Sequence, residues 1–77
     1  MDESVILIEI INKYRKKDIS FVLNVIYNFK LNESENNKFL DELYNKEKAN
    51  KIRFLSQLKL FASKHKDFTY DEEKFDK

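Results

Sequence analysis

The sequence contains no cysteine, glycine, proline or tryptophan, and only one histidine. The lack of cysteine excludes disulfides, and with a single histidine it also excludes a structural zinc site. Without glycine, no glycine-rich phosphate loop can form. Turns and chain breaks normally recruit glycine and proline, and an all-β protein of many short strands would need several of them. These absences predict a few long helices.

The chain is also short, at 77 residues, which corresponds to one small domain. A domain of this size buries only about 60–65% of the surface that its unfolded chain exposes, so its stability margin is small. Small domains usually compensate with disulfides, a structural metal or oligomerisation. Since the first two are excluded here, we expect oligomerisation or a bound partner, and we predict no metal or cofactor.

Long hydrophobic segments are missing as well. The longest apolar run, Val5–Ile11, is interrupted by Glu9 and follows Asp2 and Glu3, where a signal peptide would carry positive charge. No stretch approaches the 18 or more apolar residues of a membrane span. We therefore expect a cytoplasmic protein that does not bind membranes.

Hydrophobic periodicity predicts an all-α fold. Residues 5–11 are rich in β-branched side chains and would also suit a strand, but no second strand-like segment exists to pair with them. In the second segment, Ser20, Asn24 and Asn28 recur every four residues and leave the remaining circumference apolar, as in a central, largely buried helix. We predict a small bundle of three to four helices, over about 3–17, 19–30, 33–47 and 50–66.

Capping residues mark the starts of these helices. Asp18 is a suitable N-cap for the second helix, and Asn32 with Glu35 forms a capping box for the third. The polar stretch 46–50 contains no helix breaker, so one continuous helix over 33–66 is the alternative to two. That helix would be about 50 Å long, too long for a compact monomer, and would require a dimer. We place a break near 46–50.

The charges are unevenly distributed although the net charge is only +1. Residues 46–66 carry seven basic side chains and one acid, a net +6, and residues 67–77 carry five acids and two lysines, a net −3. We divide the chain into a helical domain, 1–66, and an acidic, aromatic tail, 67–77. The tail is either disordered or forms a short helical turn capped by Thr69, and we expect it to fold back on the basic helix or to reach a partner.

No residue pattern points to catalysis. His65 lies between Lys64 and Lys66 without an orienting partner, which suits a helix C-terminus better than a general base. The carboxylates at 41–42 and 71–73 lack the apolar surroundings that raise the pKa of a catalytic acid. We therefore predict no catalytic, cofactor-binding or metal-binding residues, and a protein that is not an enzyme.

The strongest functional signal is an excess of apolar residues, which make up 16 of the 27 positions between Val5 and Leu31. A small bundle covers roughly one face of each peripheral helix, so some apolar surface should remain exposed, and such patches mark interfaces. The alternative is that the second helix is central in a monomer. We predict a protein interface, used at least for homodimerisation, that comprises Ile6, Ile10, Phe21, Val25 and Phe29.

Two functions fit this sequence. The first is a small protein-binding module of the inhibitor, immunity, antitoxin or adaptor type; its size and Lys/Asn/Ile-rich composition are typical of accessory proteins of phages, plasmids and low-GC bacteria. The alternative is a nucleic-acid-binding regulator that uses the basic last helix. Its phosphate contacts would be Lys46, Lys48, Lys51, Arg53, Lys59, Lys64 and Lys66.

Overall fold

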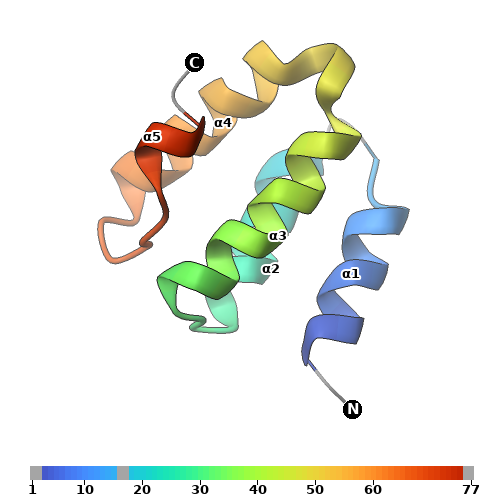
Figure 1. The fold of residues 1–77 in the computed structure, drawn as a ribbon, viewed down its shortest axis with the longest axis horizontal. Helices are drawn as coiled ribbons and strands as arrows, with labels where there is room; N and C mark the ends of the chain where they lie inside the picture. Colours follow the sequence, from blue (N-terminus) through green and yellow to red (C-terminus); the bar gives the residue numbers. More distant parts are fainter. Residues whose placement is uncertain (1–2, 16–17, 76–77) are drawn as a thin grey trace.

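The computed structural model describes residues 3–15 and 18–75, which form helices without any strand (Figure 1). The predicted all-α small bundle is confirmed. The radius of gyration is 11.4 Å, and the longest dimension is 34 Å. The elements are α1 (Glu3–Lys13), α2 (Ile19–Asn28), α3 (Glu33–Lys46), the 3₁₀ helix η2 (Lys48–Asn50), α4 (Lys51–Lys64) and α5 (Glu72–Phe75).

The first three α-helices lie alongside one another, and α4 runs across one end of this group (Figure 1). α1 packs on α2 and α3, and α4 packs mainly on α2. After α4 the chain turns back, so that α5 lies beside α4. The core collects residues from all five α-helices and from the segment before α5: Leu7, Ile11, Ile19, Val22, Leu23, Ile26, Phe39, Leu40, Leu43, Phe54, Leu55, Leu58, Phe61, Phe68 and Phe75.

The helix ends agree only partly with the predicted caps. The Asn32 side chain accepts a hydrogen bond from the Glu35 N–H at 2.8 Å, which confirms this N-cap. Asp18 stands at the N-cap position of α2, but its side chain makes no capping hydrogen bond. α1 ends at Lys13, before the predicted residue 17, and Lys46 Nζ donates to the carbonyls of Ile11 and Asn12 at 2.8 and 2.9 Å. Residues 16–17, which we expected in the last turn of α1, lie outside the described residues.

Lys30, in the turn after α2, has a positive φ of 56°, a conformation that glycine adopts most easily. A left-handed residue with a side chain costs about 1–2 kcal/mol relative to the right-handed region. The chain forms this left-handed turn although it contains no glycine.

The break between α3 and α4 lies where the sequence predicted it. The backbones of Glu47 and Asn50 lie outside the α-helical region, with φ/ψ of −99°/22° and −130°/40°. The 3₁₀ helix η2 begins directly after Glu47 and ends at Asn50. Lys51 is already helical at −59°/−34°. The chain therefore turns a corner over four residues, without glycine or proline.

The tail is docked on the body of the protein through two buried aromatic side chains. Phe68 and Phe75 are 7% and 4% exposed. Phe68 meets Phe61 of α4 edge-to-face at 5.5 Å, and Phe75 lies 6.1 Å from the ring of Tyr44 in α3. The segment therefore contributes to the hydrophobic core.

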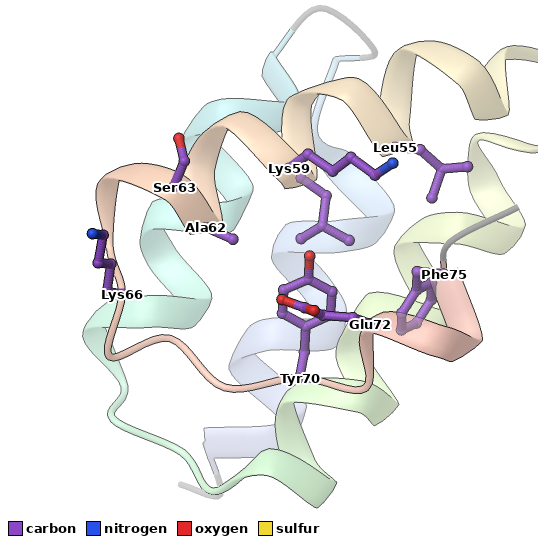
Figure 2. A pocket seen from close by; sticks show the side chains of 9 residues that line it. Leu55, Lys59, Ala62, Ser63, Lys66, Tyr70, Glu72 and Phe75 are labelled. Atoms are coloured by element: carbon purple, nitrogen blue, oxygen red, sulfur yellow. The ribbon is translucent and has the colours of Figure 1, made fainter.

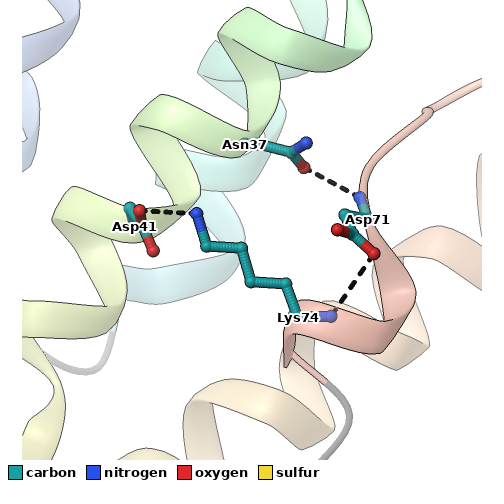
Figure 3. Close-up of polar contacts among 4 residues, drawn as sticks. All are labelled: Asn37, Asp41, Asp71 and Lys74. Atoms are coloured by element: carbon teal, nitrogen blue, oxygen red, sulfur yellow. Dashed lines mark hydrogen bonds and ion pairs between the residues drawn. The ribbon is translucent and has the colours of Figure 1, made fainter.

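Polar contacts fix the tail along α3 (Figure 3). Asn36 Nδ2 donates to the Thr69 carbonyl at 2.9 Å, and the Asp71 N–H donates to Asn37 Oδ1 at 2.8 Å. Lys74 forms an ion pair with Asp41 at 2.7 Å, so the tail contributes the base here and the body the acid, in contrast to the charge arrangement that we expected.

The cap of α5 also differs from the prediction. Asp71 Oδ1 accepts hydrogen bonds from the N–H groups of Glu73 and Lys74 at 3.1 and 3.4 Å, so Asp71 caps the helix in place of Thr69. The backbone carbonyl of Thr69 is instead the acceptor for Asn36. Both Thr69 and Asp71 are of residue types that cap helices, and docking against α3 selects between them.

We predict that Phe75→Ala lowers the free energy of unfolding by about 3–5 kcal/mol, because it leaves a cavity in the core. The matched control is the neighbouring Lys74→Ala, which removes an exposed ion pair worth about 0–1 kcal/mol. Urea unfolding followed by circular dichroism measures both. Equal, small effects of the two variants would show that the tail is not part of the core.

Candidate functional site

The five residues predicted as an interface all retain exposed surface. Ile6 and Ile10 lie one turn apart on α1, Phe21 and Val25 lie one turn apart on α2, and Phe29 is the C-cap of α2. Phe21 is 60% exposed, and the other four are half-buried. The core-facing positions of these helices, such as Leu7 and Val22, are fully buried. We name these five residues the α1–α2 apolar surface.

Part of this surface is hollowed. Ile10, Tyr14 and Phe21 line a hollow of about 380 Å³, so the structure brings the two helices' predicted residues together at this point. Ile6, Val25 and Phe29 lie on neighbouring turns and do not line it. Four of the seven lining residues are charged, two acids and two bases, namely Glu9, Lys13, Arg15 and Asp18.

Two further exposed apolar residues lie on α4. Ile52 is 77% exposed and Leu60 is 52% exposed, whereas Phe54 is fully buried. The corner at η2 sets the rotation of α4 about its axis, and this rotation decides which residues face the core. Ile52 and Leu60 are eight positions apart, and the exposed surface of α4 is rich in basic residues. The two apolar side chains therefore do not form a continuous patch.

The seven basic residues proposed as phosphate contacts do not share one face. Lys46 binds the carbonyls at the end of α1, and its Nζ lies 5.3 Å from the centre of the Tyr14 ring. Lys59 and Lys66 line a hollow between α4 and the tail (Figure 2), whereas Lys64 lines another between α2 and α4. The remaining three, Lys48, Lys51 and Arg53, are exposed around the corner.

The hollow between α4 and the tail measures about 440 Å³. The Tyr70 side chain points from the tail into it towards α4 (Figure 2). Its walls combine apolar side chains, including Leu55 and Phe75, with the charged Lys59 and Glu72. It therefore offers neither a purely apolar nor a singly charged surface.

His65 is part of an aromatic cluster at the end of α4. Its ring lies 4.5 Å from that of Tyr27 and 4.3 Å from that of Phe61. The Tyr27 hydroxyl donates to both carboxylate oxygens of Asp67 at 2.9 and 3.0 Å, and this hydrogen bond raises the pKa of Tyr27. These contacts join α2, α4 and the tail.

Within residues 3–15 and 18–75, no group of three or more histidine, aspartate or glutamate side chains is placed to hold a metal ion. No helix in that same part of the chain has the length and hydropathy needed to cross a bilayer.

A buried polar pair at the corner was not predicted from the sequence. The Glu47 side chain is 1% exposed, and neither carboxylate oxygen has a hydrogen-bond partner among the described residues. The nearby Tyr14 hydroxyl is also buried and makes no hydrogen bond of standard geometry. Burial, and then the charge of Glu47, raise the pKa of Tyr14 well above its ordinary value, against the opposing charge of Arg53.

Comparison of the chain with protein-family models, with curated proteins and with solved structures found no match.

We predict that Tyr14→Phe lowers the free energy of unfolding by about 1–3 kcal/mol at neutral pH, because it removes the hydroxyl that faces the buried Glu47 carboxylate. At alkaline pH the difference in stability between wild type and Tyr14→Phe should narrow. The raised pKa keeps folded Tyr14 protonated while the unfolded side chain ionises near its ordinary pKa of about 10, so wild-type stability falls as pH rises above that value.

Tyr14→Phe has no hydroxyl to ionise at position 14 in the unfolded chain. Its free energy of unfolding should therefore fall less than that of the wild type between neutral and alkaline pH. Urea unfolding at a series of pH values measures the difference. Tyr27→Phe is the control at neutral pH, because it deletes a hydroxyl that is hydrogen-bonded to Asp67. Identical alkaline profiles for wild type and Tyr14→Phe would contradict the burial of this hydroxyl.

Proposed function

We propose that this protein acts by binding another protein through the α1–α2 apolar surface, as a non-catalytic module of the inhibitor, immunity, antitoxin or adaptor type. The observation that carries this proposal is the exposure of Phe21, which is 60% exposed at the edge of a hollow on a surface that otherwise consists of half-buried apolar side chains. Exposed aromatic residues beside a hollow are typical anchors of protein interfaces.

The arrangement of charges supports a protein partner. Charges of both signs line the hollow, in Glu9 and Asp18 on one hand and Lys13 and Arg15 on the other, beside the apolar Ile10 and Phe21. Apolar contacts flanked by polar groups of both signs are usual in protein interfaces. Nucleic acid would require one sign of charge on one face, whereas Lys59 and Lys64 of α4 line different hollows and Lys51 and Arg53 lie at the corner.

The same surface suits a second copy of the chain. In a twofold-symmetric dimer the α1–α2 apolar surface of one chain meets the same surface of the other. Because the hollow is lined by two acids and two bases, Glu9 of one chain can pair with Lys13 of the other. We propose that the protein forms a homodimer through this surface when no other partner is bound.

Phe21→Asp should abolish self-association at micromolar concentration, because it places a charge at the centre of an apolar contact. The fold should persist, since Phe21 is 60% exposed. Leu60→Asp is the matched control: Leu60 is 52% exposed but lies on α4. Sedimentation equilibrium, with circular dichroism as a check of folding, measures both variants.

The proposal predicts a wild-type dimer, a folded Phe21→Asp monomer and a Leu60→Asp dimer. A wild-type monomer throughout the micromolar range, or dissociation by Leu60→Asp alone, would contradict the homodimer. A capture experiment then tests for a heterologous partner: bound protein should be lost with Phe21→Asp, survive nuclease treatment and depend weakly on salt. Steep salt dependence and loss on nuclease treatment would favour the nucleic-acid alternative.

A further inference from the structure

The corner between α3 and α4 is built from residues that favour a helix. Its sequence, Lys46-Glu47-Lys48-Ala49-Asn50-Lys51, contains mostly good helix formers and no breaker. The backbones of Glu47 and Asn50 lie outside the helical region, and α4 resumes helical geometry at Lys51. Local preference therefore favours one continuous helix, and tertiary contacts hold the corner closed.

The closed corner also buries a carboxylate. Both Glu47 oxygens lie out of contact with water and make no hydrogen bond of standard geometry in the part of the chain that the structure describes, although the Tyr14 hydroxyl faces them. Removing a carboxylate from water with so few polar contacts opposes folding into this arrangement. Straightening the corner would carry η2 and α4 away from the side of α3 and admit water to this end of the helix.

A straight α3–α4 helix does not fit a single chain of this fold. A continuous helix over residues 33–64 is about 48 Å long at 1.5 Å per residue, whereas the longest dimension of the protein is 34 Å. Opening would also strip Phe61 and His65 of α4 from Tyr27 of α2. The exposed aromatic surface would need to be covered by the same elements of another chain.

We infer that the protein has a second, domain-exchanged dimeric form, in which α3 and α4 join into one helix. In this form α4 and the tail of each chain pack against α1–α3 of the other. Contacts distant from the corner, such as Tyr27 with Phe61 and Asp41 with Lys74, are re-formed between the chains. Exchange of this kind needs no new interface, because each chain uses the contacts of the closed monomer.

The exchanged form does not involve the α1–α2 apolar surface and does not depend on the proposed function. The Phe21→Asp variant is therefore the background for its test, because side-by-side association through that surface is removed there. A failure of either inference then leaves the other intact.

Two substitutions at the exposed residue Asn50 should shift the equilibrium between closed monomer and exchanged dimer in opposite directions. Asn50→Ala favours the continuous helix and Asn50→Gly disfavours it. Because the dimer contains two hinges, the two variants should differ in dimer dissociation constant by on the order of 30-fold. Both chains are refolded at high and at low protein concentration and compared by sedimentation.

A cross-linking readout shows whether the dimer is exchanged. The chain has no cysteine, so Asp41→Cys with Lys74→Cys supplies its only two thiols, at positions joined by an exposed ion pair. A short bis-maleimide should join them within one chain in the closed monomer or in a side-by-side dimer, and between chains in the exchanged dimer.

Refolding the Asn50→Ala form at high concentration should therefore give a covalent dimer on a denaturing gel, and refolding it at low concentration should give cross-linked monomer. The Asn50→Gly form should give less covalent dimer at every concentration. Cross-links confined to single chains of Asn50→Ala at all concentrations, or equal dimer yields from the two hinge variants, would overturn the inference.

Discussion

The structure depends on a connected set of aromatic contacts that closes the core of a chain without disulfides. Tyr27 of α2 contacts Phe61 of α4 edge-to-face at 5.7 Å and lies 6.2 Å from Phe68 of the tail. A second group joins Tyr44 of α3 to Phe54 of α4 at 5.8 Å and to Phe75 of α5. Aromatic side chains bury large areas and favour such edge-to-face geometry, so a few of them join four segments.

This arrangement determines which surfaces remain for function. The tail and α4 are used to complete the core, and the basic residue Lys46 is used to hold the end of α1. On the flanks of α1 and α2, Ile10, Val25 and Phe29 pack partly against the core, and Phe21 is the most exposed of the five residues of the α1–α2 apolar surface. The proposed protein-binding role follows from what the core leaves uncovered.

The fold could be predicted largely from local signals. The spacing of Ser20, Asn24 and Asn28 and the Asn32 cap depend on short-range chemistry, and both appear in the structure. The corner at 46–50 followed from a length argument, because a single long helix cannot fit a compact chain.

What the sequence did not reveal depends on contacts between distant segments. The burial of Glu47, the exposure of Ile52 and the use of Asp71 as a cap all follow from how the chain turns at the corner and where the tail docks. Helical periodicity specifies faces within one element but not its rotation relative to the others. Ile6, Ile10, Phe21, Val25 and Phe29 remained accessible, but the hollow between Ile10 and Phe21 required the relative placement of α1 and α2.

The central claim is that the α1–α2 apolar surface is where this protein meets its partners. The most direct measurement is an NMR map of amide and methyl chemical-shift changes as the wild-type protein is concentrated. The account predicts changes centred on Ile10, Phe21 and Val25, with the signals of α5 and of the outer face of α4 unaffected. Changes centred instead on Ile52 and Leu60, or on the basic residues of α4, would contradict it.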